Sequence, residues 1–241
     1  MNHFLSSLIV LTATLAVSVP CQCAEVLNRT ALLIGIGTYS RPEIPVLEGV
    51  KPDMVSATAI AKAMGIPDAN IRVLRDLQAT KANILAALAR LGESTPEGAR
   101  TFVYFSGHGT RWLDPKAGGC VEGLLTYDDQ TITNSEIAAI TKKLSDKADK
   151  FVVFFDACHS GGVAPDLSLG RSVSKLRFVP KFYQKADGAG NACSQPSNFV
   201  ARGLLGETLR IGALPENFVQ ITSSLPTEVS FDEPDKGGLG T

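Results

Sequence analysis

The chain has 241 residues, of which 44% are hydrophobic, and its formal net charge is −1. This length and apolar content predict one sizeable α/β domain, with room for a second lobe in the irregular third quarter, and argue against two full domains. A nearly neutral chain without a stripe of Lys and Arg argues against nucleic acid or an anionic membrane as the main partner. No zinc-type cysteine spacing, Walker loop or internal repeat is present.

The first 24 residues have the composition of an export signal. They contain no Asp, Glu, Lys or Arg, and they include the apolar run 8–11 followed by small residues up to Ala24. We expect this segment to be removed, which leaves a mature domain of residues 25–241 that is secreted or periplasmic and not stably associated with a membrane. Because Lys and Arg are missing before the apolar run, an uncleaved membrane anchor stays open as the alternative.

Removal of the signal would leave three cysteines, Cys120, Cys158 and Cys193. In an oxidising compartment two of them can pair while the third stays reduced. A Cys120–Cys193 disulfide would make Cys158 the free thiol. Two unpaired loop cysteines are the alternative, because the sequence does not supply the separation that a disulfide requires.

Strand-like and helix-like segments alternate along the mature chain, which is typical of βαβ units and a parallel sheet. The predicted strands are 31–36, 70–74, 101–105, 151–155 and 218–222, and the predicted helices are 53–64, 80–92 and 135–144. Residues 110–133 are expected to form a loop, and residues 163–205 a basic linker.

Two of the predicted strands end in conspicuous motifs. The runs 101–105 and 151–155 are continuously apolar, as expected of central strands covered on both faces. The first leads into YFSGHG (104–109) and the second into FDACHSGG (155–162). Ligands in open α/β sheets bind outside the carboxyl ends of the strands, so Ser106, His108, Asp156 and Cys158 are predicted to line one crevice.

A thiol and an imidazole at one crevice predict a cysteine hydrolase with Cys158 as nucleophile and His108 as general base and acid. A neighbouring imidazolium lowers the pKa of a thiol and supplies thiolate. Taken singly, Cys158 could be a small buried hydrophobe and His108 a structural histidine. The two motifs together, with glycines at both strand ends, favour the dyad. His159 is predicted to point to the opposite side and is left out of it.

The two motifs, their separation and the order of the strands resemble the caspase-like fold of metacaspases and their bacterial relatives, over Arg29–Thr241. This resemblance implies an α/β three-layer sandwich, with a mostly parallel central sheet and helices on both faces. It also implies Cys158 and His108 as the catalytic pair and the backbone N–H groups of Gly109 and Cys158 as the oxyanion hole. Animal caspases differ, because their signature begins Gln-Ala-Cys where this chain has Asp156 two residues before the nucleophile.

Acidic residues near the nucleophile predict the substrate. Asp156 lies on the same side of its strand as Cys158, and Asp53 resembles the second acidic pocket residue of metacaspases. With Ser106 they would form a negatively charged S1 pocket, which selects Arg or Lys at P1 of a peptide or protein substrate. As alternatives, Asp53 could be the N-cap of its helix, Asp156 a turn cap, and Ser106 a partner of a nearby backbone group.

Calcium activates many metacaspases, but this sequence departs from their pattern. Asp128 and Asp129 could supply oxygen ligands, or could be solvated loop charges. The segment 133–136 (TNSE) stands where the relatives carry consecutive aspartates. We therefore expect no cofactor, no metal site and no obligatory calcium.

The basic linker suggests self-cleavage, with an ordinary solvated loop as the alternative. Its basic residues are Arg171, Lys175, Arg177, Lys181, Lys185 and Arg202. Two other function classes stay open: a non-catalytic caspase-fold module that binds peptides (a pseudoenzyme), and a thiol amidase acting on small amides. The oligomeric state is not predicted.

Overall fold

The structure is a computed structural model, and it describes residues 28–114, 116, 119–157, 179–183, 216–223 and 231–232, with the backbone alone at residues 119, 120, 180 and 231. The predicted signal 1–24, Cys158, His159, Cys193 and most of the linker 163–205 lie outside the described residues, and so does the Cys120 side chain. The export signal and the Cys120–Cys193 disulfide therefore stay predictions.

A five-stranded sheet forms the centre of the domain, in the order β2-β1-β3-β7-β9, and all of its neighbouring strands are parallel. Its strands are β1 (Arg29–Gly35), β2 (Ile71–Arg75), β3 (Ala99–Ser106), β7 (Ala148–Asp156) and β9 (Phe218–Thr222). They agree with the five predicted strands to within a few residues.

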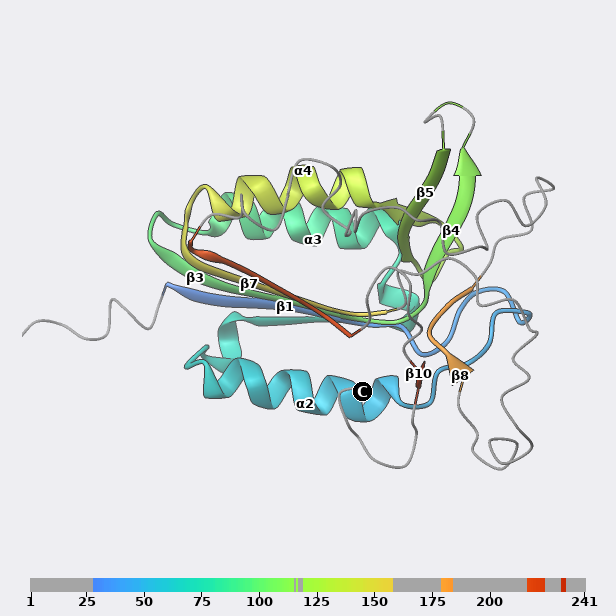
Figure 1. Ribbon diagram of the computed structural model, residues 1–241. Helices are drawn as coiled ribbons and strands as arrows, with labels where there is room; N and C mark the ends of the chain where they lie inside the picture. Colours follow the sequence, from blue (N-terminus) through green and yellow to red (C-terminus); the bar gives the residue numbers. More distant parts are fainter. Residues whose placement is uncertain are drawn as a thin grey trace, which may run out of the picture.

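Helices cover both faces of this sheet (Figure 1). The helices α3 (Lys81–Ser94) and α4 (Asn134–Ser145) lie on one face, and α2 (Val50–Ala63) lies on the other. Two 3₁₀ turns, η1 (Asp68–Asn70) and η2 (Asp76–Gln78), flank β2. The predicted three-layer α/β sandwich is confirmed. Within the described part of the chain, no helix has both the length and the hydropathy needed to cross a membrane.

Alternation along the strands divides the core into two layers. Leu32, Val103 and Phe155 belong to the cluster packed on α3 and α4, whereas Leu33 and Tyr104 belong to the cluster packed on α2. Side chains i and i+2 of a strand share a face, so the even positions of β3 and β7 face α2 near their ends. This parity decides which polar residues meet at the edge of the sheet.

The prediction of a loop at 110–133 was wrong. Three strands occupy this region and form a separate antiparallel sheet: β4 (Gly109–Asp114), β5 (Gly119–Leu125) and β6 (Thr131–Thr133). The strand β4 reads GTRWLD, which lacks the alternation of apolar and polar residues that marks a strand, and Gly119 and Gly123 weaken the pattern of β5. Cross-strand pairing, which the sequence does not display, decides the structure here.

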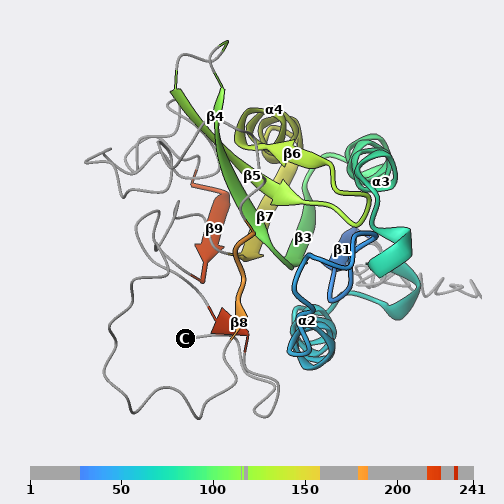
Figure 2. The same ribbon diagram turned by 90° about the vertical axis from the view of Figure 1, so that its right-hand side faces the viewer.

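A second small sheet pairs β8 (Val179–Pro180) with β10 (Phe231–Asp232) in antiparallel fashion. Figure 2 looks onto the edge of the domain where these strands lie, and shows them close to α2. Neither segment was predicted to be a strand, because two residues are too few to show periodicity.

Helix starts were predicted with mixed success. Thr80 caps α3 as expected, and its hydroxyl accepts a hydrogen bond from the Asn83 backbone at 3.2 Å. The alternative that Asp53 caps its helix was wrong, because α2 begins three residues earlier and Gly49 stands at its N-cap. The Asp53 side chain is therefore available for contacts beyond its own helix.

Candidate active site

The register of the central strands brings two predicted pocket residues side by side. Ser106 and Asp156 are the last residues of β3 and β7, and they are paired directly across the two strands. Both are fully buried on the face covered by α2. Tyr104, two residues before Ser106, donates its hydroxyl hydrogen to Asp156 Oδ2 at 3.3 Å. Asp156 is thus fixed by its strand and by a neighbouring side chain.

Asp53 reaches the same point from α2. Its Oδ2 accepts a hydrogen bond from the Ser106 hydroxyl at 2.8 Å, and the residue is only 2% exposed. The structure therefore brings together all three residues that were predicted to form the S1 pocket. The alternatives that Ser106 bonds only nearby backbone and that Asp156 acts only as a turn cap do not match these contacts.

The side chain of Lys181 fills the space between these residues. Its ammonium lies 2.7 Å from Asp53 Oδ2, 2.7 Å from Asp156 Oδ2 and 3.1 Å from the Ser106 hydroxyl. Lys181 is 1% exposed, although it comes from the predicted linker. Lys181 is one of the basic residues of the predicted linker, but no local pattern distinguishes it from the others.

The charges of this cluster depend on one another. Burial lowers the pKa of Lys181, but the two carboxylates raise it by more, so the ammonium stays charged. Burial, together with the neighbouring charge of Asp156, raises the pKa of Asp53 against the opposite effect of Lys181 and Ser106. Two carboxylates at this depth are therefore stabilised by the cation that lies between them.

Asp232 adds a carboxyl group that was not predicted. It lies in β10 and is 1% exposed, and its Oδ2 accepts a hydrogen bond from the Gly49 backbone at 2.8 Å. Burial raises its pKa, while the Gly49 backbone and the charge of Lys181 lower it by less. Within the described ranges, its Oδ1 has no hydrogen-bond partner. No residue near Asp232 in the sequence marks it as part of a site.

His108 is held by two contacts from the loop that follows β1. Its Nε2 lies 2.8 Å from the Pro45 carbonyl oxygen, and its backbone N–H donates to the Tyr39 hydroxyl at 2.7 Å. A carbonyl can only accept, so Nε2 carries the hydrogen. Nδ1 is buried and has no partner among the described residues, which leaves its lone pair as the basic site. The sequence could not name the group that orients His108.

Burial also sets the protonation of this histidine. Burial, with a smaller contribution from the charge of Lys181, lowers the pKa of His108 to about 4, against the opposite effect of the Pro45 and Lys181 carbonyls. The imidazole is consequently neutral at pH 7 in this state, as a general base must be.

The backbone N–H of Gly109, which was predicted for the oxyanion hole, donates to the Lys181 carbonyl oxygen at 2.9 Å. The other predicted donor and nucleophile, Cys158, lies outside the described residues, one position after the buried Ala157. A buried acidic pocket, a neutral histidine and a backbone N–H that donates to a carbonyl oxygen thus meet at the carboxyl ends of β3 and β7. This arrangement suits the binding of a residue with a basic side chain, whose backbone carbonyl accepts a hydrogen bond from Gly109.

Comparison with known proteins identifies the family of this chain. The model of the family described as "Caspase domain" matches residues 28–241. The chain belongs to the caspase-domain family. Metacaspase III c of Phaeodactylum tricornutum is 31% identical to it over 192 residues, which cover 75% of this chain and 52% of that protein. Metacaspase-1B of Aspergillus oryzae is 27% identical over 236 residues, which cover 85% of this chain and 56% of that protein.

The caspase domain described here thus spans about half the length of these metacaspases. Among solved structures, protein GSU0716 from Geobacter sulfurreducens matches with a TM-score of 0.55 and 18% identity, covering 86% of this chain and 76% of that one. Caspase-1 from Spodoptera frugiperda matches with a TM-score of 0.50 and 15% identity, covering 88% and 64%. These two structures support the fold, and the predicted metacaspase-like resemblance is confirmed by the family match.

The residues considered for calcium have other contacts in this caspase domain. Asp128 Oδ1 accepts hydrogen bonds from the Lys81 backbone at 3.0 Å and from the Thr126 hydroxyl at 2.7 Å, and Asp129 pairs with Arg41 at 2.9 Å. Glu136 completes a capping box with Thr133 at the start of α4. The described ranges contain no cluster of three or more potential metal-ligating His, Cys, Asp or Glu side chains. Independence from calcium stays a prediction.

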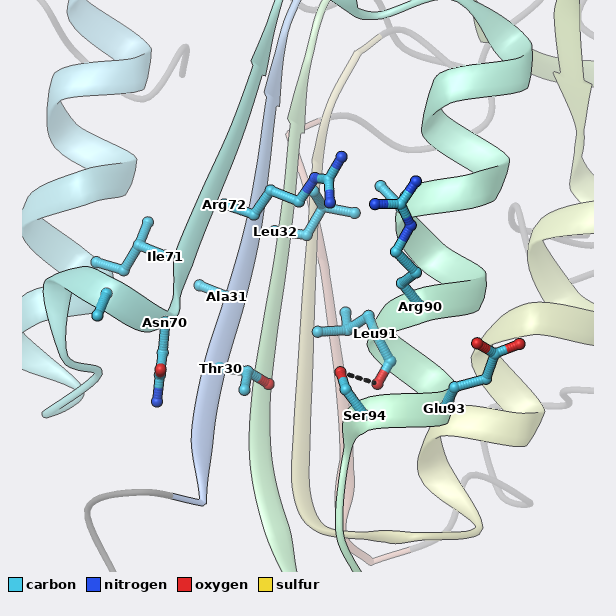
Figure 3. A pocket seen from close by; sticks show the side chains of 12 residues that line it. Thr30, Ala31, Leu32, Asn70, Ile71, Arg72, Arg90, Leu91, Glu93 and Ser94 are labelled. Atoms are coloured by element: carbon cyan, nitrogen blue, oxygen red, sulfur yellow. Dashed lines mark hydrogen bonds between the residues drawn. The ribbon is translucent and has the colours of Figure 1, made fainter.

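A separate hollow of about 770 Å³ lies at the opposite ends of the strands (Figure 3). It is bordered by the beginnings of β1 and β2 and by the last turns of α3, and its charged side chains include Arg72, Arg90 and Glu93. None of the predicted site residues lines it. The hollow is therefore distinct from the candidate active site of the caspase domain.

The Tyr39→Phe variant tests the support of the histidine loop. Removing the hydroxyl leaves the buried N–H of His108 without its acceptor, so we expect the free energy of unfolding to fall by about 1–3 kcal/mol. Chemical denaturation measures it. Tyr127→Phe is the control, because no hydrogen bond of the Tyr127 hydroxyl is found among the described residues. Equal stability of both variants would contradict the assigned contact.

The pH dependence of stability tests the burial of His108. Its pKa of about 4 in the folded chain lies below the ordinary value of 6.5, so between these values the unfolded chain binds a proton that the folded chain does not. Acidification from pH 7.5 to 5.5 should therefore cost the wild type about 1 kcal/mol more unfolding free energy than it costs His108→Gln. Parallel pH dependences of the two proteins would rule out a neutral, buried His108.

Proposed function

We propose that this protein is a cysteine endopeptidase that cleaves peptide bonds after Arg or Lys, through a Cys158–His108 dyad and an acyl-enzyme. Membership in the caspase-domain family supports peptidase activity. The predicted export signal would place the mature enzyme in the periplasm or outside the cell, where it acts on proteins or peptides and needs no cofactor.

The observation that carries the proposal is the binding of an ammonium by Asp53, Asp156 and Ser106. The cluster accepts a basic side chain at full burial, with three polar partners and a net attraction. An acidic side chain in the same place would meet two carboxylates in a poorly hydrated space, so a P1 aspartate should be rejected.

Mechanistically, the neutral Nδ1 of His108 is available to take the thiol proton of Cys158, and Pro45 holds the ring in the required tautomer. The thiolate would attack the carbonyl carbon of the P1 residue, and the Gly109 N–H would stabilise the resulting oxyanion. His108 would then protonate the departing amine, and water would hydrolyse the thioester.

Peptide reporters test the specificity. We expect reporters ending in Arg or Lys to be cleaved and a reporter ending in Asp to be cleaved at least 1,000-fold more slowly. Asp156→Asn should lower kcat/KM for the Arg reporter by about 100-fold or more, because the substrate cation loses a buried partner.

Asp149→Asn is the matched control for this variant. Asp149 is an exposed aspartate near the start of β7, at the end of the sheet opposite the pocket, where it pairs with Arg100. Its replacement should therefore leave kcat/KM unchanged. Faster turnover of the Asp reporter, or equal effects of Asp156→Asn and Asp149→Asn, would rule out the acidic S1 pocket.

An arginine-based acyloxymethyl ketone distinguishes the three function classes. An endopeptidase with this dyad should be labelled at Cys158, and labelling should be lost in His108→Ala as well as in Cys158→Ala, which peptide mapping by mass spectrometry detects. A pseudoenzyme would not be labelled. A thiol amidase would hydrolyse small amides but not peptides. Hydrolysis of a small amide and of a peptide can be measured with the same samples, before and after labelling.

A further inference from the structure

Asp76 is the first residue after β2, and it belongs neither to the buried charge cluster nor to the proposed dyad. We propose that Asp76 is a positioning residue for His108, acting through the loop 37–47, whose Tyr39 hydroxyl and Pro45 carbonyl contact that histidine. The inference rests on the proposed function, because the dyad gives the orientation of His108 its catalytic meaning. It adds to that function a residue that touches neither the thiol nor the substrate.

One carboxylate oxygen of Asp76 binds two consecutive backbone amides at the start of the loop. Its Oδ1 accepts a hydrogen bond from the Gly37 N–H at 2.9 Å and another from the Thr38 N–H at 2.9 Å. Hydrogen bonds to a charged acceptor are stronger than those between neutral groups. The contact joins the chain that leaves β2 to the chain that leaves β1, and Tyr39 follows directly after the second amide.

Gly37 is the neck of the loop, where its two ends meet. Its carbonyl oxygen accepts a hydrogen bond from the Leu47 N–H at 2.9 Å, while its own N–H donates to Asp76. A Cβ at position 37 would lie 2.8 Å from the Leu47 carbonyl oxygen, so glycine allows this close approach. Tyr39 lies two residues after the neck begins, and Pro45 lies two residues before it closes. Fixing the neck therefore fixes both groups that contact the histidine.

The contacts further along the loop are weaker. Arg41 forms ion pairs with Glu43 and Asp129, but the Arg41 and Glu43 side chains are about half exposed, and ion pairs at such positions contribute little. The Ser40 N–H donates to the Tyr127 carbonyl oxygen at 2.9 Å, which is a hydrogen bond between neutral groups. The charged acceptor at the neck is therefore expected to hold the loop more firmly than these contacts do.

The backbone of Asp76 gives independent support. Its φ of 41° lies in the left-handed region, which residues other than Gly, Asn and Asp seldom adopt. Among the described residues, Asp129 is the only other non-glycine residue with a positive φ. Such a conformation persists where the surrounding structure fixes it, and it is frequent beside functional sites. Here it accompanies a carboxylate that binds amides 39 and 38 positions away in the sequence.

Three substitutions at position 76 separate the acceptor from the backbone conformation. Asp76→Asn keeps an oxygen acceptor and tolerates the left-handed region. Asp76→Gly adopts that region without strain but has no acceptor. Asp76→Ala loses both properties. If the hydrogen bonds to the loop position the histidine, the first variant should behave like the wild type, and the other two should both be impaired.

Kinetics of the purified full chain on an Arg peptide reporter measure the effect on catalysis. We expect Asp76→Gly and Asp76→Ala to lower kcat by about tenfold or more and to leave KM within about twofold, because the residues proposed for the pocket lie outside the loop. Asp76→Asn should keep both constants within about twofold of the wild type. Glu43→Ala is the matched control, since it removes an exposed carboxylate of the same loop and should change neither constant.

The tautomer of His108 provides a measurement that does not depend on activity. In a Cys158→Ala background at pH 7, the nitrogen NMR shifts of labelled histidine should show His108 with its proton on Nε2 and none on Nδ1. Asp76→Asn should keep this tautomer, whereas Asp76→Gly and Asp76→Ala should show a mixture of the two tautomers. His108→Gln identifies the resonances. A loss of stability alone would leave the tautomer of the folded chain unchanged.

The positioning role and the peptidase activity fail in different ways. Wild-type kcat and an unchanged tautomer in Asp76→Gly would overturn the role of Asp76 and leave the endopeptidase intact. An Asp76→Asn variant as impaired as Asp76→Gly would do the same. A tautomer that changes as expected, in a protein whose wild type hydrolyses no basic reporter, would support the positioning of His108 and overturn the proposed activity. Circular dichroism checks that each variant folds, and the comparison of Asp76→Asn with Asp76→Gly suffices where Asp76→Ala does not.

Discussion

The site depends on one buried charge cluster, in which the Lys181 ammonium lies between Asp53 and Asp156. Carboxylates at this depth need a compensating charge, and removing one partner of such a pair typically costs about 3–5 kcal/mol. The folded form of the pocket is therefore stabilised by the cation that occupies it. The proposed selectivity for a basic side chain and the stability of this edge of the sheet would then have the same physical origin.

The fold creates this cluster by bringing the ends of two strands, β3 and β7, next to the first turn of the helix α2. Parity along β3 and β7 directs Ser106 and Asp156 to the α2 face, and the strand pairing sets them opposite each other. The first turns of α2 bring Asp53 to the same point. Because both strands end there, the following residues His108 and Gly109 are free to leave the sheet beside the pocket. The residues proposed for specificity and for catalysis are thus positioned by the same two strand ends.

Much of this arrangement was predictable from the sequence, for identifiable reasons. Continuous apolar runs marked the central strands, and the motifs after them identified Ser106, His108 and Asp156. Lys181, Asp232 and the Pro45 carbonyl were missed, because their roles come from contacts over long sequence separations or from backbone atoms, which leave no local pattern. The β4–β6 sheet was missed for a related reason, since its strands are defined by pairing with one another rather than by alternation.

The Lys181 cation in the pocket also affects the pKa of His108. The positive charge of Lys181 is among the causes that lower the pKa of His108, and burial is the larger one. An empty pocket would remove that charge and let the pKa of His108 rise, whereas a substrate with Arg or Lys at P1 would restore it. The neutral form of the imidazole, whose Nδ1 can accept the thiol proton, is therefore favoured when a cation is bound. In the proposed mechanism, recognition of a basic residue and preparation of the general base would be coupled through a single charge.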